Sequence, residues 1–137
     1  MGVESMSLTK VRAGSEPEAK VVLKNYGNTP AYKVEEKIKL TYIPIHAKPT
    51  FDMEAMECGV TINPTEKSIS LVDSEKIDVE RMNSFKGTSS TASAGYVLVG
   101  EVRYFTFNKW RTLRYAMHFY GAECKERELI AGQNWSD

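Results

Sequence analysis

The sequence lacks most of the features that directly indicate a class of protein or an activity. Its two cysteines, Cys58 and Cys124, are too few for a disulfide scaffold. One disulfide in an oxidising compartment and two free thiols both fit the sequence. No apolar run reaches the length of a membrane span, and residues 1–5 lack the basic and apolar regions of a signal peptide.

The chain also lacks an excess of charge of either sign. It has 18 basic and 18 acidic residues among 137, so its formal net charge is zero. Proteins that neutralise many phosphates usually carry an excess of lysine and arginine, so the composition gives no strong nucleic-acid signal. A chain of this length fits one domain that can bury a core without a metal or a disulfide.

Catalytic and metal-binding motifs are missing as well. The sequence has no Cys-x-x-Cys, no His-x-x-x-His, no nucleotide-binding glycine loop and no Gly-x-Ser-x-Gly. A metal site from His46, His118, Cys58 and Cys124 has no supporting spacing. A thiol–imidazole pair of Cys58 and His118 is a weak hypothesis, because the neighbouring Glu57 would raise the thiol pKa. We therefore expect a protein that is no enzyme and has no cofactor, metal or catalytic residue.

What the sequence does contain is strand periodicity. In residues 31–42 the apolar side chains recur every second residue, interrupted by Glu36, and lysines dominate the alternate positions. This period is typical of a strand with one face on a core and the other in water. The core-face set is Tyr32, Val34, Ile38, Leu40 and Tyr42.

Other segments complete an all-β pattern. We expect short strands at residues 3–11, 19–25 and 67–72, and a long connection at 44–66 with at most one short strand. Ile77, Arg81 and Phe85 recur at helical spacing after Asp73-Ser74, which predicts a short helix over 74–85. A small, polar segment at 88–95 predicts an exposed loop.

The C-terminal part predicts a β-hairpin with arms near residues 96–105 and 112–119, joined around Asn108-Lys109. Apolar residues on both faces of the first arm indicate a central strand. The prediction is an antiparallel β-sandwich of about seven strands with one short helix over residues 3–121, followed by a peripheral tail at 122–137.

Basic and aromatic residues interleave along this hairpin and form the candidate ligand-binding cluster. One interpretation is that the arginines pair with acids such as Glu101 across neighbouring strands. The other is that the cluster stacks on carbohydrate or nucleic acid. Zero net charge favours the first interpretation. The candidate residues are Arg103, Tyr104, Trp110, Arg111, Arg114 and Tyr115.

Two motifs carry a resemblance to a known family. Residues 21–34 contain Asn25-Tyr26-Gly27-Asn28-Thr29-Pro30-Ala31, and residues 100–112 begin Gly100-Glu101-Val102-Arg103-Tyr104. In this order and separation they resemble the extracytoplasmic immunoglobulin-like β-sandwich domains of uncharacterised bacterial inner-membrane proteins. The hairpin departs from the family pattern, with Thr106 where Asp is frequent and Asn108-Lys109 in place of a Phe-Gly turn.

The resemblance implies an immunoglobulin-like sandwich, membrane helices preceding the domain, and a location on the extracytoplasmic side of the bacterial inner membrane. That family has no assigned activity, so no catalytic residue carries over. We expect an interaction or structural module with an unknown protein partner; the alternative is a carbohydrate- or nucleic-acid-binding module. Exposed edge strands also predict a weak homodimer, although the sequence does not identify the edge.

Overall fold

The protein folds into two facing antiparallel sheets. The computed structural model describes residues 1–44, 56–84, 94–121, 124–130 and 134–136. The smaller sheet has the order β1-β2-β5, with β1 (Gly2–Thr9), β2 (Glu18–Lys24) and β5 (Lys67–Asp73). The larger has the order β4-β3-β6-β7-β8, with β4 (Met56–Ile62), β3 (Ala31–Pro44), β6 (Ala94–Thr106), β7 (Lys109–Tyr120) and β8 (Glu126–Leu129).

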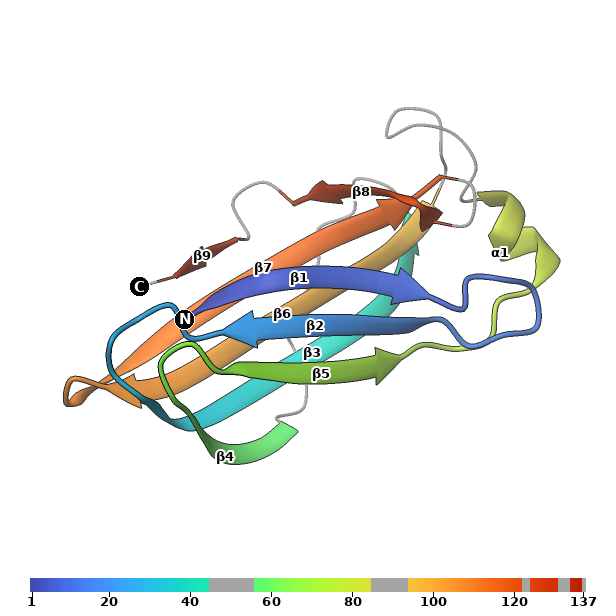
Figure 1. The fold of residues 1–137 in the computed structure, drawn as a ribbon. Coiled ribbons are helices and arrows are strands. Elements are labelled where there is room, and N and C mark those ends of the chain that lie inside the picture. Colours follow the sequence, from blue (N-terminus) through green and yellow to red (C-terminus); the bar gives the residue numbers. More distant parts are fainter. Residues whose placement is uncertain (45–55, 85–93, 122–123, 131–133, 137) are drawn as a thin grey trace.

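Two small elements complete the described chain: β9 (Trp135–Ser136), which pairs with β7, and the helix α1 (Val79–Ser84). Both chain termini lie near the β6–β7 turn, and α1 lies at the opposite end of the sandwich (Figure 1). The described part of the chain contains no helix long and apolar enough to cross a membrane.

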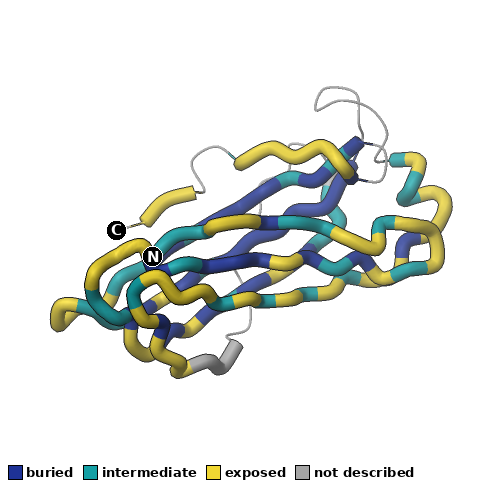
Figure 2. The backbone as a smooth tube through the Cα atoms, in the orientation of Figure 1, coloured by how far each residue is buried: buried dark blue, intermediate teal, exposed yellow. Residues whose placement is uncertain are grey.

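The predicted fold class is confirmed. The first, second and fifth strands form one sheet, and the third pairs with the sixth, which pairs with the seventh. This is the strand order of an immunoglobulin-like sandwich in which the fourth strand joins the sheet of the third. The tail adds β8 and β9 to the edge beyond β7, where their residues are exposed (Figure 2).

The core lies between the inner faces of the two sheets. Strands β3, β6 and β7 supply most of its buried residues, and β2 supplies three more (Figure 2). A smaller apolar cluster lies on the outer face of the larger sheet, as expected for a central strand that is apolar on both sides. The inner core includes Val21, Leu23, Tyr96, Leu98, Val102 and Tyr115, and the outer cluster is Val97, Val99 and Ala116.

One predicted core residue lies on the wrong face. The pairing of β3 with β6 shifts register between Tyr32 and Glu35, and Lys33 has a positive φ of 50°. Because an extra residue reverses the alternation of side chains, Tyr32 leaves the core face and is 47% exposed. Glu36, which interrupts the predicted apolar face, is buried on that face at 2% exposure.

The hairpin turn lies one residue earlier than the sequence predicted. Strand β6 ends at Thr106, and the two turn residues are Phe107 and Asn108, with φ of 49° and 60°. Positive φ at both positions is the requirement of the tight turns that match the twist of a hairpin. Asparagine adopts this conformation readily, whereas a bulky aromatic residue does so rarely.

The helix is shorter than the predicted range of 74–85. It begins at Val79 because Asp78 caps it, accepting a hydrogen bond on Oδ1 from the Arg81 N–H at 2.8 Å. Ile77, predicted as helical, instead precedes the helix and is buried. Phe85 and most of the predicted loop at 88–95 lie outside the described residues.

The first resemblance motif holds a turn together. Asn25 is buried, and its Nδ2 donates to the carbonyls of Thr29 at 2.8 Å and Ile62 at 2.9 Å. Its Oδ1 accepts from the Gly27 N–H at 2.9 Å. One amide side chain thus links the β2–β3 turn to β4. The asparagine of this motif therefore has a structural role.

Candidate interaction surface

The six candidate residues do not form one cluster. Strand alternation sends them to opposite faces of the larger sheet, as the pairing of Gly100 with Tyr115 and of Tyr104 with Arg111 shows. The inner face carries Tyr104, Arg111 and Tyr115, whereas the outer face carries Arg103, Trp110 and Arg114.

Tyr115 belongs to a buried polar network that joins the two sheets. Its hydroxyl donates to Glu36 Oε1 at 2.6 Å, and Ser70 Oγ donates to Glu36 Oε2. Glu36 comes from β3, Tyr115 from β7, and Ser70 from β5 of the opposite sheet. Both carboxylate oxygens have a partner, which a buried acidic group requires.

The ring of Tyr115 lies directly over Gly100 on β6. A β-carbon at position 100 would lie 2.0 Å from Cζ of Tyr115, so only glycine fits here. Burial raises the pKa of Tyr115 far above its ordinary value, and the neighbouring Glu36 raises it further. Tyr115 is therefore a structural residue and is not available to a ligand.

Tyr104 and Arg111 line a small hollow near the hairpin end. The hollow has a volume of about 180 Å³ and also touches Asn25 and Thr29 of the β2–β3 turn. Tyr104 is 7% exposed and belongs to the main core, so it offers no stacking surface.

The outer face presents a row of three aromatic residues across β3, β6 and β7. Tyr32 lies opposite Phe105, and Phe105 lies opposite Trp110. Tyr32 is 47% and Trp110 42% exposed. Phe105 and Trp110 meet edge to face with ring centroids 5.7 Å apart, and the Arg103 guanidinium lies 4.9 Å from the centroid of Trp110. We call Tyr32, Phe105, Trp110 and Arg103 the aromatic row.

The hairpin tip carries a further exposed aromatic residue, Phe107, which also lines the small hollow beside Tyr104 and Arg111. Phe107 is 73% exposed and follows Phe105 by two residues. An exposed phenylalanine at a positive φ gains neither burial nor a relaxed backbone, and such positions are found preferentially at functional sites.

Arg114, the third outer residue, has structural partners. Its Nε donates to Glu101 Oε2 at 2.7 Å, and its guanidinium lies 5.4 Å from the ring centroid of Trp135 on β9. The predicted cross-strand pairing with Glu101 is therefore confirmed for this arginine.

Sequence reasoning missed Tyr32, Phe105 and Phe107. Phe105 could have been found, because it lies two residues after Arg103 in one strand and therefore shares its face. The same alternation places Tyr104 on the opposite face from Arg103. Tyr32 carried no usable signal, because only the bulge at Lys33 moves it to the outer face.

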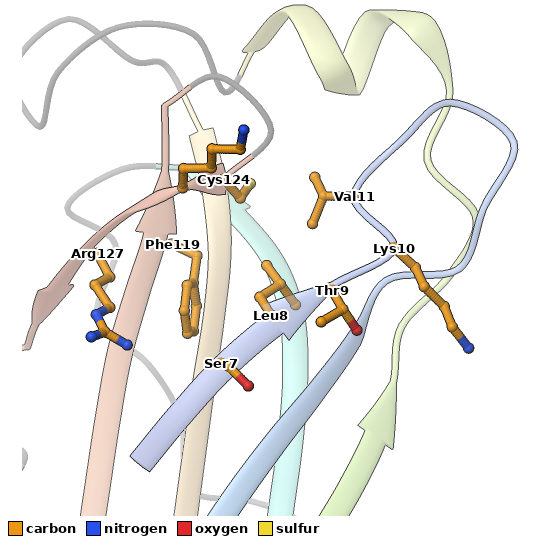
Figure 3. Close-up of a pocket in the computed structure, with 9 residues that line it drawn as sticks. Ser7, Leu8, Thr9, Lys10, Val11, Phe119, Cys124 and Arg127 are labelled. Carbon is orange, nitrogen blue, oxygen red and sulfur yellow. The ribbon is translucent and has the colours of Figure 1, made fainter.

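Two larger hollows lie beside β1. One of about 440 Å³ lies between the end of β1 and the segment after β7, over Leu8 and Phe119 (Figure 3). Two basic residues that line this hollow have partners within the protein: Lys10 contacts Glu18 at 3.8 Å, and Arg127 donates to the Met6 carbonyl at 2.9 Å. A neighbouring groove of about 470 Å³ runs between β1 and β7–β9.

The thiol in the first hollow is chemically quiet. Cys124 is a free cysteine at 4% exposure, and burial raises the pKa of its thiol to about 12. A thiol with this pKa stays protonated at neutral pH, so it is a poor nucleophile there.

The strands that carry Cys58 and His118 are not neighbours. Cys58 belongs to β4 and His118 to β7, and β3 and β6 lie between these strands, which sets the two strand backbones roughly 14 Å apart. His46 lies outside the described residues. Over the described ranges, no group of three or more His, Cys, Asp or Glu side chains is arranged to hold a metal ion.

Comparison of the chain with protein-family profiles, with curated proteins and with solved structures found no match.

Proposed function

We propose that this protein is a non-enzymatic interaction module that binds a protein partner through the aromatic row. The observation that carries the proposal is the exposure of Tyr32 and Trp110 beside Arg103 on the outer face of the larger sheet. The sheet fixes the backbone that carries these side chains, so no backbone segment has to be ordered when a partner binds.

The composition of the surface supports a protein partner. Tyrosine, tryptophan, phenylalanine and arginine are enriched in protein–protein interfaces, and tryptophan, tyrosine and arginine dominate their energetic centres. Phe107 at the hairpin tip adds apolar area at the same end of the molecule. Exposed apolar side chains grouped in this way are typical of interaction sites.

Two features of the same face disfavour a sugar or a nucleic acid. Arg103 and Phe105 already contact the ring of Trp110, which leaves less of it for stacking. The cations also have acidic neighbours: Glu35 lies opposite Arg103 in the strand register, and Glu101 lies between Lys37 and Arg114. A phosphate-binding surface would leave such cations without acidic neighbours.

We further propose that this module is the soluble, extracytoplasmic part of a membrane-anchored bacterial protein. The support is the resemblance of residues 21–34 and 100–112, whose implied fold agrees with the observed sandwich. Fractionation of the source cells with an antibody to residues 94–121 tests this location. Recovery with the membranes, and digestion by protease added to spheroplasts, are expected; recovery in the cytosol would contradict it.

Photo-crosslinking tests the interaction. A benzophenone amino acid at position 32 should capture one protein partner in the source cells, and Trp110→Ala in the same chain should abolish the capture. With that partner purified, Trp110→Ala should weaken binding at least about 10-fold, the range of an interface hot spot.

Trp135→Ala is the matched control. Trp135 is 43% exposed and lies beside an arginine, as Trp110 does, but on β9. It should leave the affinity within about 3-fold, a change under 1 kcal/mol. Equal losses in the two variants would contradict a site at the aromatic row. Saturable quenching of Trp110 fluorescence by a glycan or an oligonucleotide would instead support the alternative ligand classes.

A further inference from the structure

Strand β5 forms one edge of the smaller sheet. The order is β1-β2-β5, and among the described residues no strand pairs with the side of β5 that faces away from β2. Edge strands present a row of backbone donors and acceptors that can pair with another chain. This surface is separate from the aromatic row, which lies on the larger sheet.

Two hydrogen bonds at the ends of β5 show which of its residues direct their backbone N–H and C=O groups toward the open edge. The Asn25 N–H donates to the Glu66 carbonyl at 3.1 Å, and the Ser74 N–H donates to the Pro17 carbonyl at 3.0 Å. Even-numbered residues of β5 thus direct their backbone groups toward β2, and the β2–β5 register has no irregularity. Because backbone direction alternates along a strand, the odd-numbered residues direct theirs to the open edge.

The same odd-numbered residues carry the exposed side chains of the strand. Ile69 is 60% and Leu71 52% exposed, whereas Ser70 points inward to Glu36 and Val72 packs against the core. Two large aliphatic side chains on an open edge are the combination that soluble proteins usually avoid or cover.

The sequence of β5 is complementary to itself when it is read in the opposite direction. If a second copy pairs antiparallel about a twofold axis at Ser70, Ile69 lies opposite Leu71 of that copy, and Lys67 lies opposite Asp73. All four are residues whose backbone groups face the open edge, so this register also supplies the hydrogen bonds. A shift of two residues would place Lys67 opposite Leu71 in one direction and Asp73 opposite Ile69 in the other. Either shift leaves Asp73 without an opposite charge.

The other described edges are less suited to pairing. Strand β1 has the polar Glu4, Ser7 and Thr9 exposed or half-buried, and its Met6 carbonyl already accepts from Arg127. Strand β8 is short and charged, as Glu126–Leu129 shows. Strand β4 shows two register shifts in its pairing with β3, so its edge is irregular.

We propose that two copies of this chain associate through β5, in antiparallel register about Ser70, to form one continuous six-stranded sheet. The Lys67 ammonium, which contacts Glu4 within its own chain at 2.9 Å, would gain Asp73 of the second copy as a further partner. One strand pair buries less surface than a standard stable interface, so the dimer should be weak, with a Kd of about 10 µM or more.

Sedimentation velocity between about 5 and 500 µM, a range chosen to bracket that Kd, tests the proposal. The apparent mass should rise with concentration from 15.4 kDa toward twice that value. Ile69→Pro removes an N–H that only the second copy would use, and edge strands tolerate proline at such positions. It should abolish the dimer without loss of fold, and Leu71→Lys should do the same.

Val60→Lys is the matched control for the second substitution. Val60 is a 47% exposed apolar residue on β4, and its replacement should leave the dimer unchanged. A single mass at all concentrations would overturn the proposal. So would a dimer that survives both Ile69→Pro and Leu71→Lys while circular dichroism shows a native sheet.

Charge reversal tests the register. Lys67→Asp should weaken the dimer at least 5-fold, because two acids then face each other across each half of the interface. Adding Asp73→Lys should restore most of the affinity, although the contact with Glu4 stays lost. Failure of the double variant to recover would overturn the register about Ser70.

Discussion

The inner and outer faces of the β6–β7 hairpin carry the same kinds of residue in opposite surroundings. On the inner face the Tyr115 hydroxyl donates to a buried glutamate, and its ring covers Gly100. On the outer face the Trp110 ring contacts Arg103 and Phe105 and remains 42% exposed.

The difference shows how burial decides the role of an aromatic residue. The polar atom of a buried tyrosine needs a partner in a fixed position, so Tyr115 serves the fold. An exposed ring keeps apolar area that a partner can cover, so Trp110 is available for binding. Substitutions on the two faces should therefore separate stability from binding.

The largest effect is expected on the inner face, from Gly100→Ala. The added β-carbon would overlap the Tyr115 ring and displace it from Glu36. We expect a loss of about 3 kcal/mol in the free energy of unfolding, measured by urea denaturation. Gly2→Ala is the control, because its nearest ring belongs to the exposed Tyr26 and can move. Similar losses in both variants would show that position 100 is not special.

Tyr115→Phe should have the next largest effect. It keeps the ring but removes the donor to Glu36, which leaves a buried carboxylate with one hydrogen bond fewer. The expected loss is about 2 kcal/mol in the free energy of unfolding. Tyr26→Phe, at a tyrosine that is 59% exposed, should cost almost nothing. A Tyr115→Phe variant as stable as the wild type would contradict the role of the network.

Alkaline pH should lower the free energy of unfolding of the wild type through Tyr115 on the inner face. The pKa of Tyr115 is raised in the folded state, mainly by burial, whereas the unfolded chain loses this proton near the ordinary value of about 10. Above that pH the folded state binds more protons than the unfolded state, so the free energy of unfolding falls as pH rises. Between about pH 9 and 11, the wild type should lose about 1 kcal/mol more than Tyr115→Phe. Parallel curves would rule out this linkage.

The smallest effect on stability is expected on the outer face. Trp110→Ala removes one edge-to-face contact and one contact with arginine, which together contribute about 1 kcal/mol. Leu113→Ala, at a buried residue of the same strand, should cost two to five times as much, about 2–5 kcal/mol in urea denaturation. Equal losses would mean that the aromatic row belongs to the core.

Much of the fold was predictable because local pattern and burial agree. The alternation in residues 34–42 and the two apolar faces of residues 96–105 each predicted the burial of a strand correctly. Within the second resemblance motif, Gly100, Val102 and Tyr104 lie on the inner face of β6. These residues recur at every second position because they pack against the core. The candidate site was predicted less well, because Tyr104 and Tyr115 were grouped with Arg103 and Trp110 by closeness in sequence alone.

By itself, the sequence determined an antiparallel β-sandwich, since side-chain alternation and turn residues are local properties of the chain. Only the tertiary structure decided which side chains of different strands share a face and which strand forms an edge. Tyr32 reached the outer face because one bulge at Lys33 reversed the alternation. Glu36 could be buried because Ser70 and Tyr115, 34 and 79 residues away along the chain, provide its hydrogen bonds. Such contacts depend on register between distant strands, which no local pattern encodes.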